Sequence, residues 1–497
     1  IRDDAGRVVF EQDGVEAPAT WSQGAVNVVA SRYFRGAPGA PGREGSVKEL
    51  VSRVGGVLAR WVEEGGLGGE GYEAELLSLL VRQRGAFNSP VWFNVGVEAR
   101  PQCSACFILS VEDNIASILE LARVEAFIFK RGSGAGTNLS PLRSSRERLS
   151  GGGIASGPVS FMRGYDAFAG VVKSGGRARR AAKMQVLDAA HPDIVEFVEA
   201  KAKEERKARA LLAAGFSGGL DGEAYRSVAF QNSNLSVRVP DAFFRAAESG
   251  GEWTTRAVTT GARVEAFPAR TLLRRIAESA WTCGDPGIQC EDTIHLWNPC
   301  KESGRVTASN PCSEYLFLDD TACNLASLNL LPFLAEDATL DVPGFRAAAG
   351  TLFRAMEAIV DRAAYPTPRI ERNSRRFRPL GLGYANLGAL LMALGLPYDS
   401  EEARGWAAAV TALMTGEAYL VSAKLAAACG PMEAFAENRD SFLAVLERHR
   451  ASHDRVRAGP PAPLAAAREA WGEALTLAGR HGVRNAQATV IAPTGTI

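Results

Sequence analysis

Short apolar runs alternate with amphipathic segments along this chain from Gly85 onward. The patterns predict a strand over 106–111, a helix over 114–129, a second helix over 159–172 and a second strand over 184–187. Strands that alternate with helices form parallel sheets, because each helix carries the chain back to the start of the next strand. We therefore predict an α/β fold for residues 85–497.

Residues 1–84 follow a different pattern. Gly- and Pro-rich loops, such as 36–45, alternate with apolar residues at helical spacing, among them Leu50, Val54 and Leu58. We predict a small helical N-terminal region that precedes the α/β domain.

Composition narrows the functional classes. The 497 residues include 56 Lys and Arg and 56 Asp and Glu, whereas a nucleic-acid scaffold needs an excess of basic residues. No apolar run reaches the roughly 18 residues of a membrane-spanning helix, and 8 cysteines are too few for a disulfide scaffold of this length. We expect a soluble, cytoplasmic protein that binds neither nucleic acid nor membrane. Because the chain starts at Ile1 and stops at Ile497 in a Gly-containing turn, we also expect both ends to be cut.

Two glycine-rich stretches, 132–136 and 175–176, are either turns or phosphate-binding loops. The first lacks the Lys-Ser/Thr of a Walker loop and the spacing of a dinucleotide fingerprint. Nearby basic residues are Lys130, Arg131 and Arg143 for the first stretch and Arg177, Arg179 and Arg180 for the second. For each stretch alone, a structural turn is the simpler explanation.

The segment Asn310-Pro-Cys-Ser-Glu314 concentrates reactive side chains. Pro311 removes an amide donor and disfavours a helical Asn310, so we expect extended chain with a period of two. Asn310, Cys312 and Glu314 would then project to one side. There a carboxylate can accept a hydroxyl proton, an amide can orient a hydroxyl, and sulfur can do nucleophilic or radical chemistry. The alternative is a turn with a small buried cysteine.

Other cysteines could supply electrons. Cys106 starts a predicted strand and Cys323 follows the 310–314 segment, and a pair that cycles between dithiol and disulfide is a two-electron reductant. Cys103 and Cys106 also form a single C-x-x-C, which could be a redox motif or half a zinc site. Structural zinc needs four ligands and no second C-x-x-C follows. No histidine has metal-site spacing, so we predict no metal.

The last residues, Pro493-Thr-Gly-Thr496, follow a β-type segment over 488–491. Hydroxyls and backbone amides at the carboxyl end of a strand suit a phosphate group. Such a turn alone is equally well explained as a purely structural one.

Taken in order, these motifs resemble those of the adenosylcobalamin-dependent, class II ribonucleotide reductases. The series consists of Thr20-Trp-Ser-Gln23, Phe87-Asn-Ser-Pro-Val-Trp-Phe-Asn-Val-Gly96, Ser104-Ala-Cys-Phe107, Phe129-Lys-Arg-Gly-Ser-Gly-Ala-Gly-Thr-Asn-Leu-Ser140, Phe230-Gln-Asn-Ser-Asn234, Gly284-Asp-Pro-Gly287, Asn310-Pro-Cys-Ser-Glu314 and Pro493-Thr-Gly-Thr-Ile497. It spans nearly the whole chain in the family's order, which favours a functional role for 310–314.

The resemblance implies a ten-stranded α/β barrel made of two antiparallel five-stranded halves, with Cys312 on a loop at its centre. Cys312 would be the transient thiyl radical that removes the 3′ hydrogen of a ribonucleotide. Glu314 would take the 3′-hydroxyl proton, and Asn310 would hold the ribose hydroxyls. Cys106 and Cys323 would reduce the 2′ position and finish as a disulfide.

The resemblance also implies ligand sites. The residues at the substrate diphosphate would be Pro493, Thr494, Gly495, Thr496 and Ser89. At an effector site, Asp113 would bind the ribose and Arg143 the phosphates. The loop 175–180, with Arg177 and Arg179, would relay the identity of the effector to the choice of substrate base.

The implied cofactor is adenosylcobalamin, and the implied partners are a deoxynucleotide or ATP effector, a thioredoxin-type reductant and a second copy of the chain. Because the chain stops inside the expected barrel, we expect much of the cobalamin surface and a reducing cysteine pair to lie beyond Ile497, and the chain alone to be inactive. Three alternatives stay open. They are a class I large subunit with a radical from a second protein, a nucleotide-binding regulator without turnover, and a structural zinc protein.

Overall fold

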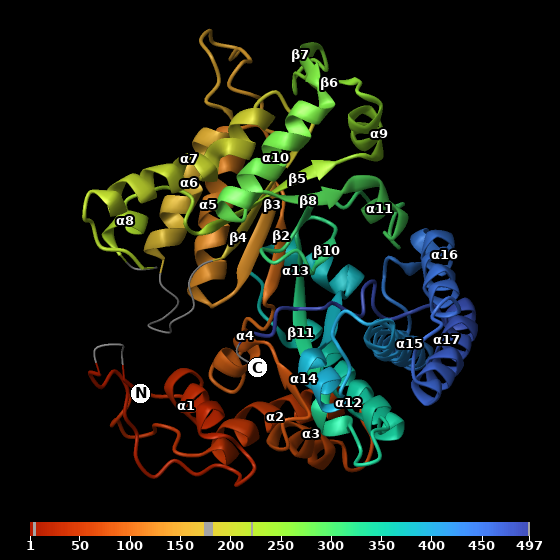
Figure 1. Ribbon diagram of the computed structural model, residues 1–497. Coiled ribbons are helices and arrows are strands. Elements are labelled where there is room, and N and C mark those ends of the chain that lie inside the picture. The colour runs from red at the N-terminus through yellow and green to blue at the C-terminus, as the bar shows by residue number, and fades with distance from the viewer. Residues whose placement is uncertain (3–5, 173–181, 220–221, 496–497) are drawn as a thin grey trace. The chain divides into compact units, whose positions relative to one another are not determined.

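The computed structural model describes residues 1–2, 6–172, 182–219 and 222–495. The chain divides into two compact units, each with its own dense internal packing. The first comprises Ile1–Ala105, Pro299–Ser303 and Ala322–Ile497, and the second comprises Cys106–Asn298 and Gly304–Thr321. Figure 1 labels most of their helices and strands.

The second unit is built on a parallel sheet with the strand order β2–β3–β4–β5–β8. The strands are β2 (Cys106–Leu109), β3 (Gly134–Asn138), β4 (Lys183–Asp188), β5 (Ser233–Val239) and β8 (Gly287–Cys290). Strands β2 and β4 confirm the predicted strands at 106–111 and 184–187. Five parallel strands correspond to one half of the predicted barrel.

Helices follow the strands of this sheet, as the alternating pattern predicts. They are α5 (Ile115–Lys130), α6 (Gly157–Val171), α7 (Ile194–Ala213), α8 (Glu223–Arg226), α9 (Asp241–Ser249), α10 (Ala269–Cys283) and α11 (Glu291–Leu296), with a separate hairpin of β6 (Glu252–Arg256) and β7 (Arg263–Pro268). Helix α5 begins where the Asn114 side chain accepts a hydrogen bond from the Ser117 amide. Figure 1 shows α5, α6, α7 and α10 alongside the strands.

The two faces of this sheet have different partners. Lys183 of β4 points toward α5, where its Nζ lies 2.5 Å from Glu125 Oε2. Because side chains alternate along a strand, the Met184 side chain points to the opposite face. Gly136, the register partner of Met184 on β3, has its Cα hydrogen on that same face. A short hairpin of β9 (Ala308–Ser309) and β10 (Leu316–Phe317) lies on this second face. We call the two sides the helix face and the hairpin face.

The first unit is mostly helical. Its elements outside the strands are α1 (Gln23–Arg32), α2 (Val47–Glu64), α3 (Tyr72–Val81), α4 (Ser89–Asn94), the 3₁₀ turn η1 (Leu331–Phe333), α12 (Val342–Arg362), α13 (Pro368–Phe377), α14 (Leu387–Ala393), α15 (Glu401–Cys429), α16 (Phe435–His453) and α17 (Pro461–His481). Ser46 and Glu49 form a capping box that starts α2. Leu50, Val54 and Leu58 of α2 are buried, which confirms the helical N-terminal region.

The strands of the first unit are β1 (Gly85–Phe87), β11 (Thr321–Asn329) and β12 (Leu380–Ala385). Strand β1 pairs antiparallel with β11, and β11 pairs parallel with β12. The β-type segment predicted at 488–491 reduces to a single bridge between Thr489 and Leu382. The reason is that this segment runs beside β12 only as far as Val490, whose amide donates to the Leu382 carbonyl of β12, and then turns away.

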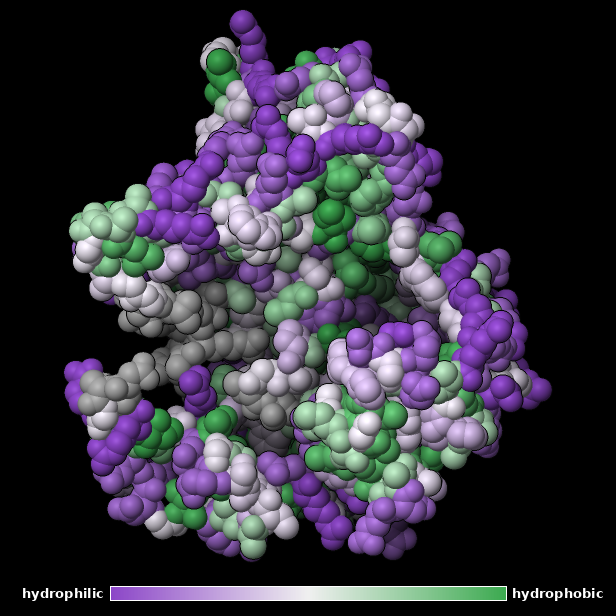
Figure 2. Space-filling model, viewed as in Figure 1, coloured by the Kyte–Doolittle hydropathy of each residue, from purple (hydrophilic) through white to green (hydrophobic). Residues whose placement is uncertain are grey.

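Figure 2 shows hydrophilic and hydrophobic residues interspersed over the visible face. Within the described ranges, we find no helix with the length and apolar character needed to cross a membrane.

Candidate active site

Residues 310–315 form the turn of the β9–β10 hairpin. The Ser313 amide donates to the Asn310 carbonyl, and the Asn310 amide donates to the Tyr315 carbonyl, both over 3.1 Å. The Asn310 Oδ1 accepts a further hydrogen bond from the Tyr315 amide. The segment is therefore a tight turn, whereas the sequence predicted extended chain.

The reason for this difference is Ser313, whose φ of +63° reverses the chain just after Cys312. Pro311 excludes a helix, as predicted, but it is also compatible with a turn. The predicted alternative, a turn with a small buried cysteine, is right about the turn and wrong about the burial, because Cys312 is exposed. Asn310 is buried and Glu314 is half-buried.

Asn310 and Glu314 converge on Cys106, which starts β2 on the hairpin face. The Asn310 amide nitrogen Nδ2 lies 3.0 Å from the Cys106 sulfur and donates to it. The sulfur lies 3.7 Å from Glu314 Oε1, to which the thiol donates. Glu314 Oε2 is buried without a hydrogen-bond partner among the described residues. One carboxylate oxygen thus faces a cysteine, while the other is a buried acceptor without a hydrogen bond within the described ranges.

Two amide side chains that the sequence did not single out hold the turn from the sheet. Asn234 of β5 donates to the Pro311 carbonyl over 2.8 Å. Gln289 of β8 donates to the Ser309 hydroxyl over 2.8 Å and to that of Ser313 over 3.4 Å. Their signal was present, because both lie in or beside motifs of the ordered series, at 230–234 and 284–287.

A buried cation also lies on this face. Arg238 of β5 is the register partner of both Asp188 and Gln289. Burial lowers the pKa of its guanidinium, while the nearby carboxylates, led by Asp188 and Glu291, raise it. None of its three side-chain nitrogens has a hydrogen-bond partner within the described part of the chain. Sequence reasoning missed this residue.

The other predicted redox and phosphate residues belong to the first unit. Cys323 is buried in β11. Ser89 begins α4, and its hydroxyl lies 3.0 Å from that of Tyr33. Pro493 and Gly495 are exposed, and Thr494 between them is half-buried with a φ of +50°. Thr496 lies outside the described residues.

The two predicted effector residues form a pair in the second unit. Arg143 Nε lies 2.6 Å from Asp113 Oδ2, and the Arg143 amide donates to Asp113 Oδ1 over 3.2 Å. Both side chains are about one quarter exposed. The remaining effector candidates, Arg177 and Arg179, lie outside the described residues.

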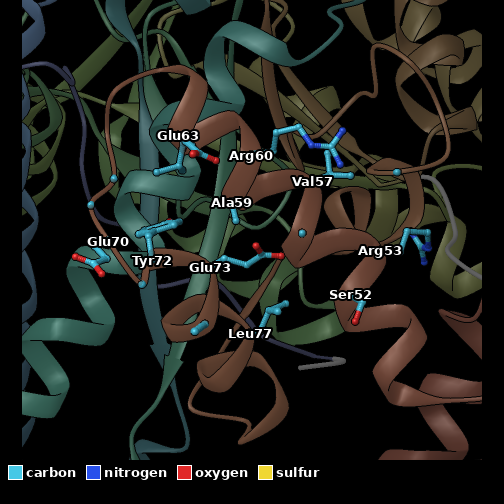
Figure 3. Close-up of a pocket in the computed structure, with 17 residues that line it drawn as sticks. Ser52, Arg53, Val57, Ala59, Arg60, Glu63, Glu70, Tyr72, Glu73 and Leu77 are labelled. Atoms are coloured by element: carbon cyan, nitrogen blue, oxygen red, sulfur yellow. The ribbon is translucent and has the colours of Figure 1, made fainter.

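A cavity of about 1100 Å³ is lined mostly by the N-terminal helical region and by none of the predicted site residues. Figure 3 shows that side chains of both charges surround it, with Arg60 and Glu63 from α2 and Glu73 from α3.

Cys103, the other half of the C-x-x-C, is fully buried in the first unit. Among the described residues we find no group of three His, Cys, Asp or Glu side chains that could hold a metal ion, so the zinc alternative gains no support.

The β9–β10 turn and the parallel sheet thus bring an amide, a carboxylate and a cysteine together in an α/β fold, beside an exposed cysteine. Residues 104–497 match the family model of the ribonucleotide reductase barrel domain, and residues 1–77 match that of class II vitamin B12-dependent ribonucleotide reductase. The chain belongs to the ribonucleotide reductase family, in its vitamin B12-dependent class II.

Individual relatives agree with this assignment. The chain is 50% identical to a vitamin B12-dependent ribonucleotide reductase of Rhodopirellula baltica, over 100% of this chain and 51% of the relative. It is 51% identical to one of Streptomyces coelicolor, over 99% of this chain and 52% of the relative. It is 35% identical to a vitamin B12-dependent ribonucleoside-diphosphate reductase of Mycobacterium tuberculosis H37Rv, over 97% of this chain and 60% of the relative. The chain thus spans about half the length of the first two relatives.

Proposed function

We propose that this chain carries the substrate-reducing centre of an enzyme that converts ribonucleoside diphosphates to 2′-deoxyribonucleotides by a thiyl-radical mechanism. The observation that carries the proposal is the convergence of Asn310 and Glu314 on Cys106, at a turn whose tip exposes Cys312. This reaction needs an acid–base group, an amide and three thiols, and Cys106 and Cys312 are two of these thiols.

Each residue of the turn would have a separate task. Cys312, as a thiyl radical, would take the 3′ hydrogen of the ribose and return it at the end. Glu314 Oε2 would accept the proton of the 3′-hydroxyl, because general bases act on protons within hydrogen-bond reach. The Asn310 amide would orient the ribose hydroxyls, and so exchange its bond to Cys106 for a bond to substrate.

Cys106 and Cys323 would supply the two electrons. The 2′ C–O bond breaks, the oxygen leaves as water with a proton from Cys106, and a hydrogen replaces it at the 2′ carbon. The two thiols lose two electrons and two protons in total and form one S–S bond. An external dithiol of the thioredoxin type would reduce this disulfide by thiol exchange.

Adenosylcobalamin, the cofactor that class II reductases use, supplies one-electron radical chemistry when bound. Cys312 fits this requirement, because a thiol can lose a hydrogen atom only to a group that reaches its sulfur, and Cys312 is an exposed residue. Cys312 would be the residue of this chain that faces the cofactor.

The diphosphate of the substrate would bind at the chain's last residues. The exposed Pro493–Gly495 turn offers backbone amides and the Thr494 hydroxyl, and Thr496 and Ser89 would add two more hydroxyls. The name of the Mycobacterium tuberculosis relative supports a diphosphate as substrate.

An effector nucleotide would bind at Asp113 and Arg143. In the ligand-free pair each charge already faces the other, so an effector would have to replace this ion pair with bonds to its ribose and its phosphates. Arg177 and Arg179 would pass the effector's identity on to the substrate base.

The same unit would pair with a second copy of the chain. Helices α5 and α6 pack together and expose five large apolar side chains, each between 50% and 73% exposed: Ile115, Leu119, Phe127, Phe168 and Val171. Such a patch marks a protein interface more often than a free surface. Leu119→Glu would then shift the protein toward monomers in analytical ultracentrifugation.

The test of the proposed function uses the full-length protein with adenosylcobalamin, dithiothreitol and no partner subunit. We expect reduction of ribonucleoside diphosphates, in preference to triphosphates when both compete. We expect Cys312→Ser to abolish the reaction. Reduction that survives this substitution would exclude the thiyl mechanism. Strict dependence on a second protein would exclude the cobalamin mechanism, and bound nucleotide without any turnover would indicate a regulator.

A further inference from the structure

Two glycines let the 309–314 turn lie directly on strand β3. A Cβ added at Gly136 would lie 1.7 Å from the Ser309 carbonyl oxygen, and one at Gly134 would lie 2.6 Å from Pro311 Cγ. Both distances are far shorter than van der Waals contact. This close approach explains the two glycines without a bound phosphate, and it leaves no freedom for the turn to move toward the sheet.

Two amides hold the same turn on either side of Cys312. Asn234 donates to the carbonyl of Pro311, the residue before Cys312. Gln289 donates to the hydroxyl of Ser313, the residue after it, and to that of Ser309. Asn234 lies on β5 and Gln289 lies on β8. These two strands are parallel neighbours, in a register that pairs Ser236 with Gly287. The sheet thereby fixes both ends of the short segment that carries the sulfur.

Ser313 makes such a restraint necessary. A φ of +63° is unfavourable for a residue with a side chain, so the isolated turn would relax to other conformations. Cys312 is exposed, and the backbone that carries its sulfur is held through the contacts of Pro311 and Ser313.

We propose that Gln289 and Asn234 are positioning residues for Cys312. They act through Pro311 and Ser313 to keep the sulfur at one place relative to the ribose. The inference rests on the proposed function, because it assigns these two amides to the hydrogen transfer at Cys312. A displacement of about 1 Å at a reacting atom can lower the rate about 100-fold, so the loss of either amide should be visible in the chemical step.

The substitutions that test this remove the hydrogen-bond donor of each side chain. They are Gln289→Leu and Asn234→Asp in the full-length protein, because Asp cannot donate to the Pro311 carbonyl. We expect kcat to fall about 10- to 100-fold with KM within threefold of wild type. We also expect the deuterium isotope effect with 3′-deuterated substrate to increase, because hydrogen transfer becomes rate-limiting.

The matched control is Gln185→Leu. Gln185 is a fully buried glutamine of β4, and strand alternation places it on the helix face, away from the turn. We expect it to leave both kcat and the isotope effect unchanged. In the Gln289 and Asn234 variants, a fall in kcat with an unchanged isotope effect would mean that fewer molecules are folded, and it would overturn the inference. A kcat within twofold of wild type would also overturn it.

Failure of this inference is distinguishable from failure of the proposed function. If Cys312→Ser abolishes reduction while Gln289→Leu and Asn234→Asp behave like the control, only the positioning role is wrong. If Cys312→Ser leaves reduction intact, the proposed function itself is wrong.

Discussion

The carboxylate oxygen Oε1 of Glu314 lies 3.7 Å from the sulfur of Cys106, although 208 residues separate the two in the sequence. The carboxylate follows the exposed Cys312 by two residues, and the Cys106 thiol begins the first strand of the parallel sheet. Proton transfer and thiol chemistry can therefore take place at one point.

Glu314→Gln tests the proposed proton transfer. The amide keeps an oxygen that can accept from Cys106, but it cannot take a proton from a substrate hydroxyl. Because general bases contribute about 100- to 10,000-fold to rates, we expect kcat of the full-length enzyme to fall by that factor. Glu336→Gln, at an exposed glutamate, is the control. A kcat within threefold of wild type would exclude Glu314 as the base.

The proposed redox pair, Cys106 and Cys323, can be tested in a single turnover. Without an external dithiol, we expect one disulfide between Cys106 and Cys323 for each deoxynucleotide formed, detected as a cross-linked peptide by mass spectrometry. Cys323→Ser should abolish the cross-link, whereas Cys103→Ser, at a fully buried neighbour of Cys106 in sequence, should not. A cross-link that contains Cys103 instead would contradict the assignment.

The proposed effector site at Asp113 and Arg143 predicts how nucleotide affinity responds to substitution. Arg143→Ala should raise the Kd for a deoxynucleoside triphosphate at least tenfold in equilibrium dialysis, because charge-assisted bonds to phosphate are lost. Arg143→Lys should raise it less, since the charge remains but the planar fork does not. The control is Arg146→Ala. Arg146 is close to Arg143 in sequence and forms an exposed ion pair with Glu265. Equal losses in the Arg143→Ala and Arg146→Ala variants would indicate only a general charge effect.

The Lys183–Glu125 ion pair on the helix face predicts a stability change. Burial lowers the pKa of Lys183 and raises that of Glu125, while their mutual attraction opposes both shifts. Lys183→Met leaves a buried carboxylate unpaired and should lower the free energy of unfolding by about 3–5 kcal/mol in urea titrations. The double variant Lys183→Met/Glu125→Leu should be clearly more stable than the single one. If the double variant is the less stable, the pair is not a coupled buried charge.

Glu147 predicts a pH dependence. Burial alone would raise the pKa of this carboxyl group, but hydrogen bonds from Thr259, Ser144 and Val258 outweigh it and hold the pKa at about 2. Because this value is below the ordinary one of 4.5, the stabilisation is complete above pH 4.5 and is lost as the pH falls toward 2. Wild type should therefore lose more stability between pH 5 and 3 than Glu147→Gln does, as followed by thermal unfolding. Parallel curves would contradict this.

The elements that depend on local pattern were predictable. The strand β2, the helices α5 and α6 and the strand β4 lie where apolar periodicity placed them, because a buried face imposes its period on the sequence. The 310–314 turn was not predictable in this way. Pro311 excludes a helix in either case, and the left-handed Ser313 that distinguishes a turn from extended chain has no sequence signal of its own.

The sequence by itself predicted the α/β class and the family, and it singled out Asn310, Cys312 and Glu314, since these predictions depend on residue type, spacing and order. The tertiary structure alone decided that Glu314 and Asn310 meet at Cys106 and that Asn234 and Gln289 hold the turn. The physical reason is that such contacts depend on how strands pair and on how closely the hairpin approaches β3. Strand register fixes the first and side-chain packing fixes the second, and neither produces a periodic pattern in the amino-acid sequence.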